Sequence, residues 1–221
     1  MSAKSHLKPA GDWDLLRHPP EFSLVLGGPL FQLMRRVHLS DDALMMARQR
    51  VIVIAMLAWL PLLLLCAMEG QLWGGTVAVP FLKDVEVHIR FLVALPILIV
   101  AELVVHRRMR PLIQQFLERN MVPENGLSRF KAAIDSALRL RNSVSAEVLL
   151  IALVYGLGIL IIWRQYMALD TATWYATPSA GGSTLTVAGM WYGYVSLPLF
   201  QFLLVRWYFR LFIWARFLWQ V

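Results

Sequence analysis

The chain has 221 residues, of which 58% are hydrophobic and only 16% are charged, and this composition is too apolar for an ordinary soluble domain. Its formal net charge of +7 comes without a groove-reading motif, so we expect membrane lipids, and not nucleic acid, beside the basic residues. The lone Cys66 excludes a disulfide framework and a thiolate metal site, and the sequence predicts neither a metal nor a cofactor.

Residues 1–49 are predicted to form a cytoplasmic tail. The tail contains an apolar segment at 22–37 that is interrupted by Gly27, Gly28 and Pro29. This segment is too short and too broken to cross a bilayer, so we expect it to lie in the interface or to re-enter the membrane from one side.

Four weakly charged, apolar stretches follow, and each is a candidate membrane span: residues 51–68, 91–105, 148–163 and 185–205. A spanning helix needs roughly 20 apolar residues to cross about 30 Å of hydrocarbon, so four spans fit, although the second and third are short. The predicted fold class is therefore all-α, a polytopic membrane protein with about four transmembrane helices. Residues 50–105 would hold the first two helices, and residues 148–205 the other two.

Basic residues are distributed very unequally between the two sides of these spans. Of the 21 Lys and Arg residues, 18 lie in residues 1–50, in 106–147 or after the fourth span. Because basic loops stay in the cytoplasm, the amino terminus is predicted to lie inside. The loops at 69–88 and 164–184 are then external.

The cytoplasmic loop at 106–147 is predicted to fold as an amphipathic helical hairpin. Its apolar residues recur at helical spacing on one face: Phe130, Ala133, Ile134, Ala137 and Leu138. The favoured interpretation is a basic connector that helps to fix the topology. The alternative is a docking surface for a cytoplasmic protein partner.

Aromatic residues gather near the predicted external boundaries: Trp73, Trp163, Tyr166, Trp174, Tyr175, Trp191 and Tyr192. Amphipathic rings favour the headgroup level of a bilayer, so we expect these residues to anchor the protein in the membrane. Residues 171–184 are small and polar, and they predict a flexible external loop.

Glu102 is a costly side chain, since it lies about one turn inside the second predicted span. His106 follows four residues later on the same helical face, and Glu147 lies at the same depth in the third span. Glu102 and His106 could exchange a proton or share a metal ion. Two ligands are too few for a metal site, however, and the adjacent Arg107 and Arg108 oppose a cation. The favoured interpretation pairs each glutamate with a nearby arginine.

A second polar group, Glu86, His88 and Arg90, precedes the second span on the external side. In an extended segment alternate residues share one face, so these three side chains would converge, whereas a helix would scatter them. In the sequence, no nucleophile, oxyanion donor or third ligand completes a catalytic site around them. The favoured interpretation is a salt-bridged cap over the helix bundle, which Glu69 could join.

Pro61, Pro96 and Pro198 fall near the middle of three spans, and each frees a backbone carbonyl. Transporters use such broken helices to build sites in mid-membrane, although proline is also common in membrane helices in general. Small residues four apart predict close helix packing or a homo-oligomer: Ala152 with Gly156, and Gly189 with Gly193.

Three runs, EFSLVLGGPLFQLMRRVHLSDD, GGTVAVPFLKDVEVHIRFLVALP and AELVVHRRMRPLIQQFLERNMVPE, resemble a family of uncharacterised proteobacterial multi-pass inner-membrane proteins. The resemblance implies a bacterial inner-membrane location and carries no assigned activity, cofactor or site residue. It also implies more chain beyond Val221. Residues 206–221 stay aromatic and basic, which predicts either an interfacial helix or the start of a further C-terminal region.

Three classes of function remain open on the sequence alone. The favoured class is a structural, assembly or sensory membrane subunit that works through its helix faces and its cytoplasmic hairpin. A small-solute or proton-coupled transporter or channel would use Glu102 and the mid-span prolines. A membrane-embedded enzyme would need the external group of Glu86, His88 and Arg90, and this class has the least support.

Overall fold

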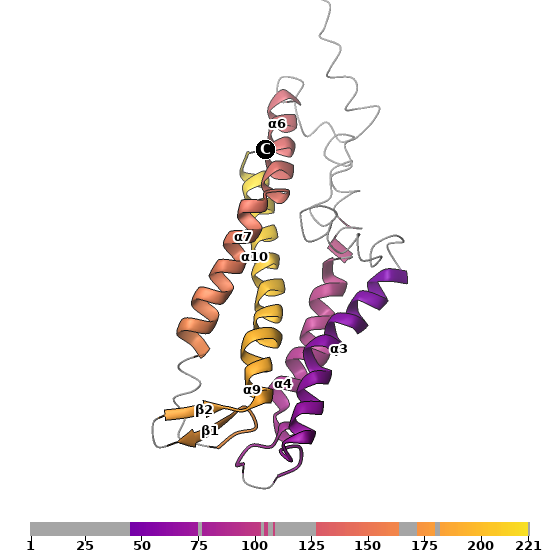
Figure 1. Ribbon diagram of the computed structural model, residues 1–221. Coiled ribbons are helices and arrows are strands. Elements are labelled where there is room, and N and C mark those ends of the chain that lie inside the picture. Colours follow the sequence, from indigo (N-terminus) through magenta and orange to yellow (C-terminus); the bar gives the residue numbers. More distant parts are fainter. Residues whose placement is uncertain are drawn as a thin grey trace, which may run out of the picture.

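The computed structural model describes residues 45–74, 77–102, 104–105, 108, 127–163, 172–179 and 182–220. These residues are mostly helical, as predicted, and long helices run the length of the molecule with a short β-hairpin at one end (Figure 1). The segment at 22–37, His106 and the first half of the predicted cytoplasmic hairpin lie outside the described residues.

Two of the described helices are long and apolar enough to cross a membrane. One is Arg48–Met68, which forms most of α3 (Met45–Met68), and the other is Val187–Gln220. A third candidate is the pair Ser128–Arg141 and Val144–Gly158, whose two helices are bent by 51° where they meet. The prediction of membrane-spanning helices is confirmed to this extent.

The predicted second span is a continuous helix in three parts: α4 (Val85–His88), the π-helical η2 (Ile89–Ala94) and residues 95–102. A single 3₁₀ turn, η1 (Phe81–Lys83), precedes it. Asp84 caps the first turn of α4, because its carboxylate accepts a hydrogen bond from the Val87 amide at 3.3 Å. The polar residues that precede the apolar core are therefore helical and not extended.

The next described helix, α6 (Leu127–Arg141), is separated from α7 (Val144–Leu153) by a sharp break. Ser143 begins the new helix, since its hydroxyl accepts a hydrogen bond from the Ala146 amide at 3.2 Å. The π-helical η4 (Val154–Trp163) then extends α7 through the predicted third span.

The segment predicted to be a flexible external loop contains a two-stranded hairpin instead. Strands β1 (Ala176–Ser179) and β2 (Gly182–Leu185) pair in antiparallel fashion. Thr177 and Thr184 face each other across the pair, with their hydroxyl oxygens 3.1 Å apart. Such cross-strand threonine pairs stabilise a sheet. The prediction of a loop followed from the small polar residues of the segment, which are more typical of loops than of strands.

The last helix is the longest, and it has three parts: α9 (Val187–Trp191), the π-helical η5 (Tyr192–Ser196) and α10 (Leu197–Gln220). Together they form a rod of 34 residues, which is roughly 51 Å long at 1.5 Å per residue. The hydrocarbon core of a bilayer is only about 30 Å thick, so about 20 Å of this helix would project beyond it. Residues 206–220 continue this helix and do not form a separate interfacial one.

Two clusters of buried side chains hold the helices together. The larger cluster lies beside the hairpin and includes these residues of less than 2% exposure: Ala58, Leu62, Phe81, Phe91, Leu95 and Trp174. The smaller cluster joins α6 to the far end of α10 through Phe130, Ile134, Ile213 and Phe217. The apolar face predicted for α6 is therefore the face that packs against α10.

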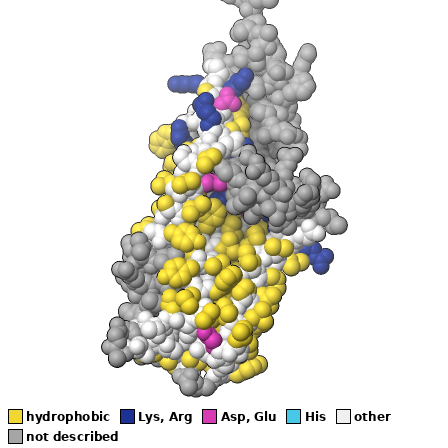
Figure 2. Space-filling model, in the orientation of Figure 1, with side chains coloured by type: hydrophobic (Ala, Val, Ile, Leu, Met, Phe, Trp, Pro, Cys, Tyr) yellow, Lys and Arg dark blue, Asp and Glu magenta, His cyan; other side chains and the backbone are white. Residues whose placement is uncertain are grey.

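Apolar side chains also cover much of the outer surface. Figure 2 shows them along the middle of the molecule, while Lys and Arg side chains gather at the end where α6 lies. Leu57, Leu64 and Leu149, from α3 and α7, are about half exposed or more. An apolar surface of this extent suits contact with lipid tails.

Candidate functional site

Glu102 is the centre of an ion-pair network toward the α6 end of the molecule. The Arg210 side chain donates a hydrogen bond to Glu102 Oε1 at 2.5 Å, and Arg50 donates to Oε2 at 3.4 Å. Arg206 adds a longer ion pair to Oε1, at 3.9 Å. Three guanidinium groups, from α3 and α10, thus surround one carboxylate of the second helix.

Glu147 extends the network to a fourth helix. Arg206 lies 3.8 Å from Glu147 Oε1, so its guanidinium bridges the carboxylates of two different helices. The side chains of Glu102, Arg206 and Arg210 are each 7% exposed, and that of Glu147 is 13% exposed. The network therefore links α3, the second helix, α7 and α10 inside the protein.

The helices bring these charges to one common depth. Counted from the hairpin end at 1.5 Å per residue, Arg50, Glu102 and Arg206 lie roughly 25 to 29 Å along their helices. The two edges of the hydrocarbon core are about 30 Å apart. Helices that start together at one edge would therefore reach the opposite edge at this network.

Burial makes the network sensitive to the loss of any one member. Taking a charged group out of water costs several kcal/mol, and a close partner must offset this cost. Removing one partner of a buried pair typically costs about 3–5 kcal/mol, because the other charge stays buried without compensation. The network therefore constrains which faces of the four helices can meet.

Part of the network follows from the sequence. The favoured interpretation paired Glu102 and Glu147 with nearby arginines, and the contacts to Arg206 and Arg210 confirm it. Sequence reasoning did not single out the arginines themselves. The signal was available, since basic residues that flank the first and fourth spans lie at the same end of the bundle as Glu102. His106, its predicted companion, lies outside the described residues.

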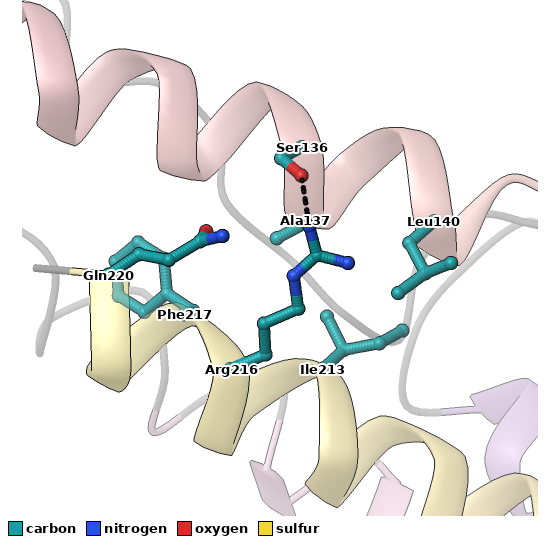
Figure 3. A pocket seen from close by; sticks show the side chains of 7 residues that line it. All are labelled: Ser136, Ala137, Leu140, Ile213, Arg216, Phe217 and Gln220. Carbon is teal, nitrogen blue, oxygen red and sulfur yellow. Dashed lines mark hydrogen bonds between the residues drawn. The ribbon is translucent and has the colours of Figure 1, made fainter.

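Beyond the network, α6 packs along the end of α10 (Figure 3). Arg216 of α10 donates a hydrogen bond to Ser136 Oγ of α6 at 3.4 Å. Ala137, Ile213 and Phe217 line the same seam, and the space between the two helices does not admit a water molecule. The contact is therefore a packed interface and not an open binding pocket.

The external polar residues lie at the opposite end of the molecule, where Arg90 joins several helices. Glu86 and Arg90 are one helical turn apart and form an ion pair. Arg90 also donates a hydrogen bond to the Tyr192 hydroxyl at 2.5 Å, and its guanidinium lies 5.9 Å from the centre of the Phe200 ring. Arg90 thus ties the second helix to η5 and α10.

His88 points to a different neighbour. Trp59 of α3 donates a hydrogen bond from Nε1 to His88 Nδ1 at 3.0 Å. The His88 ring also meets the Phe81 ring edge to face, with the ring centres 5.0 Å apart. The convergence of Glu86, His88 and Arg90 expected for an extended segment is absent, because the segment is helical.

A cap over the bundle is present at this end, and hydrogen bonds of the hairpin region fasten it. Trp174 is fully buried and donates from Nε1 to Asp84 Oδ2 at 2.9 Å. Glu69 accepts a hydrogen bond from the Val187 amide at 3.0 Å. These contacts join Trp174 and the start of α9 to residues that flank the first two helices.

The external aromatic side chains that the structure describes differ in burial, while those of Trp163 and Tyr166 lie outside the described ones. Trp73 is 76% exposed, as expected for a membrane anchor. Trp174 and Tyr192 are 0% and 7% exposed, so they belong to the core and the anchoring prediction is wrong for them. Tyr175 packs edge to face on Trp174, with the ring centres 5.2 Å apart. Their positions near a span boundary did not reveal this, because burial depends on how the hairpin folds.

The described residues contain no group of three or more His, Cys, Asp or Glu side chains that could hold a metal ion. The carboxylates of Glu102 and Glu147 face guanidinium groups, which oppose a cation. Cys66 is a free thiol buried in α3. What this arrangement supports chemically is ion pairing between helices.

Comparison with known proteins adds no relative: no protein family, no curated protein and no solved structure matches the chain. The resemblance to proteobacterial inner-membrane proteins stays a prediction that depends on the three quoted runs. The function must therefore be inferred from the geometry.

Proposed function

We propose that the chain is a multi-pass protein of the bacterial inner membrane that crosses the bilayer four times and acts as a structural, assembly or sensory subunit. The common depth of Arg50, Glu102 and Arg206 and the ion pair between Arg206 and Glu147 support this topology, with the hairpin across the external ends of the spans. The second and third spans are short because Glu102 and Glu147 mark their cytoplasmic ends.

The distribution of charge supports an orientation with α6 and the amino terminus in the cytoplasm. Among the described residues, Lys83 and Arg90 are basic and lie near the hairpin. The other described basic residues lie toward the α6 end: Arg48, Arg50, Arg108, Arg129, Lys131, Arg139, Arg141, Arg206, Arg210 and Arg216. Basic residues accumulate on the cytoplasmic side of membrane proteins.

The observation that carries the proposal is the projection of α10 together with α6. In this placement the continuous last helix extends about 20 Å beyond the membrane, and α6 packs against its projecting end. Phe130 and Ile134 of α6 are buried against α10, so the helix presents its opposite, charged face to solvent. The exposed residues of this face include Arg129, Lys131, Asp135 and Arg139.

The polar residues that suggested other functions are engaged in contacts between helices. Glu102 is held by three arginines, which accounts for a carboxylate at this depth without assigning it a proton or a solute. Arg90 and His88 join the second helix to η5 and to α3. A subunit that works through its surfaces needs no further chemistry from these groups.

A photocrosslinking amino acid placed in the full chain, in cells at native expression level, tests the proposal. At Lys131, on the exposed face of α6, we expect a discrete crosslinked protein that mass spectrometry identifies. At Ser179, which is exposed on the external hairpin, the same product should be absent. No product at Lys131, together with a proton-coupled flux that Glu102→Gln abolishes, would replace the subunit proposal with the transport alternative.

A further inference from the structure

The ion-pair network contains more cationic than anionic groups among the described residues. Arg50, Arg206 and Arg210 face the carboxylates of Glu102 and Glu147, so one guanidinium charge has no counterpart within the described part of the chain. Burying a charge without a counterion is energetically unfavourable. The imbalance predicts an additional anion at this place.

The same arginines have hydrogen-bond donors to spare. Each guanidinium carries five N–H donors, yet within the described residues only Glu102 accepts hydrogen bonds from Arg50 and Arg210. Arg206 contributes only its two ion pairs, which are 3.8 and 3.9 Å long. The Arg50 Nε atom is buried and has no hydrogen-bond partner in the described part of the chain. These donors suit a group that is rich in acceptor oxygens.

We propose that Arg50 and Arg206 bind the phosphate group of an anionic phospholipid from the cytoplasmic leaflet. A phosphate combines negative charge with several acceptor oxygens, and the planar guanidinium donates to it with paired N–H groups. This proposal rests on the membrane placement proposed above, in which the network lies at the cytoplasmic edge of the hydrocarbon core, next to the headgroup phosphates.

Apolar surface for the acyl chains lies beside the network. Val53 lies about one helical turn after Arg50 on α3 and is 46% exposed. Ile151 lies about one turn after Glu147 on α7 and is also 46% exposed. A lipid whose phosphate contacts the arginines could therefore extend its chains along helix faces that already suit hydrocarbon.

Lipid binding by the purified full chain tests the proposal. The protein in mild detergent is given phosphatidylglycerol or phosphatidylcholine with identical acyl chains, and native mass spectrometry measures the bound lipid. We expect phosphatidylglycerol to bind more tightly and to raise the midpoint of thermal unfolding. Arg206→Gln should weaken this binding about tenfold, the usual effect of losing a charged hydrogen-bonding group.

Two further variants make the result specific. Arg139→Gln removes the same charge from the exposed face of α6 and should leave the binding of phosphatidylglycerol unchanged. Arg206→Lys keeps the charge but loses the fork of paired donors, so its affinity should lie between those of the wild type and Arg206→Gln. The lysine variant also provides a readout if the glutamine variant does not fold.

Equal binding of the two lipids, or unchanged binding of phosphatidylglycerol by folded Arg206→Gln, would overturn the proposal. Stabilisation by inorganic phosphate that matches the effect of phosphatidylglycerol would assign the site to free phosphate and overturn the lipid source. These measurements use detergent-solubilised protein, so they fail or succeed independently of the crosslinking that tests the subunit proposal.

Discussion

The hydroxyl of Tyr155 donates a hydrogen bond to the main-chain carbonyl of Tyr194 at 3.3 Å. That carbonyl lies four residues before Pro198, which has no N–H group to donate to it. In the proposed membrane span no water would reach such a carbonyl, and the side chain of the neighbouring helix supplies the donor. This hydrogen bond therefore joins the third and fourth predicted spans next to Pro198.

Tyr155→Phe removes this donor and leaves the ring in place. We expect the free energy of unfolding to fall by about 0.5–1.5 kcal/mol, the usual range for a hydrogen bond between membrane helices. Unfolding in a titration with SDS, followed by tryptophan fluorescence, measures it. Tyr194→Phe is the matched control, because it leaves the accepting carbonyl intact. Equal losses in the two variants would show that the Tyr155 hydroxyl is not the relevant donor.

Arg210→Gln tests the centre of the ion-pair network. The substitution removes the 2.5 Å contact to Glu102, and we expect a loss of about 1.5–3 kcal/mol, because Glu102 loses its closest hydrogen-bond donor but keeps its ion pairs with Arg50 and Arg206. Arg216→Gln is the control, since Arg216 is exposed and its contact with Ser136 is 3.4 Å long. The free energy of unfolding should change there by less than about 1 kcal/mol.

Adding Glu102→Gln to Arg210→Gln should cost less than the sum of the two single substitutions, because both remove the same 2.5 Å contact. The double variant is compared with both single variants in the same SDS titration. Additive losses would contradict the assignment of Glu102 as the partner of Arg210.

Gly189 and Gly156 differ in the space around them, so alanine substitutions at the two positions should have different effects. A Cβ atom at Gly189 would lie 1.9 Å from the Tyr175 carbonyl oxygen, which is main chain and cannot rotate away. Gly189→Ala should therefore displace the hairpin and lower the midpoint of thermal unfolding by several degrees. At Gly156 nothing lies within 4 Å, so Gly156→Ala should be neutral or slightly stabilising.

The same pair bears on the predicted homo-oligomer. If a second copy packs against the face of Ala152 and Gly156, Gly156→Ala should lower the oligomeric state measured by light scattering in detergent. Gly189→Ala should leave the oligomeric state unchanged. Loss of stability on Gly156→Ala without a change in mass would contradict both expectations for this position.

The hydrogen bond from Trp59 to His88 is best measured as a coupling energy. Trp59→Phe, His88→Ala and the double variant form a cycle in which the 3.0 Å contact should contribute about 1 kcal/mol. Trp73→Phe, at an exposed tryptophan of the same end, controls for the change in fluorescence. Additive effects within error would mean that the contact does not stabilise the fold.

Local patterns predicted the helices and their buried faces. The apolar residues of α6 recur at helical spacing within fifteen residues, and the residues so predicted, Phe130 to Ala137, are those that contact α10. The hairpin could not be predicted in this way. The contact between Trp174 and Asp84 joins residues 90 positions apart, and no local period reports it.

The sequence identified Glu102 because a buried carboxylate is energetically costly, but it did not identify the arginines that pair with it. Glu102 stands out because a carboxylate inside an apolar span needs a counterion. Its closest partner, Arg210, lies 108 positions away, on a helix whose register relative to Glu102 depends on the length of every span between them. For Glu86, His88 and Arg90 the prediction depended on local structure instead. They would share one face of a strand, but the segment is helical and separates them.

Cysteine labelling in intact cells tests the proposed topology. Ser179→Cys on the hairpin and Ser128→Cys on α6 are both at exposed positions, at opposite ends of the molecule. The background is a Cys66→Ala chain, in which no other thiol reacts because Cys66 is the only cysteine. With the hairpin in the periplasm, a membrane-impermeant maleimide should label Ser179→Cys in whole cells and Ser128→Cys only after the inner membrane is opened. The reverse pattern would show that the orientation is inverted. The basic face of α6 would then lie outside, which would rule out the cytoplasmic partner expected there.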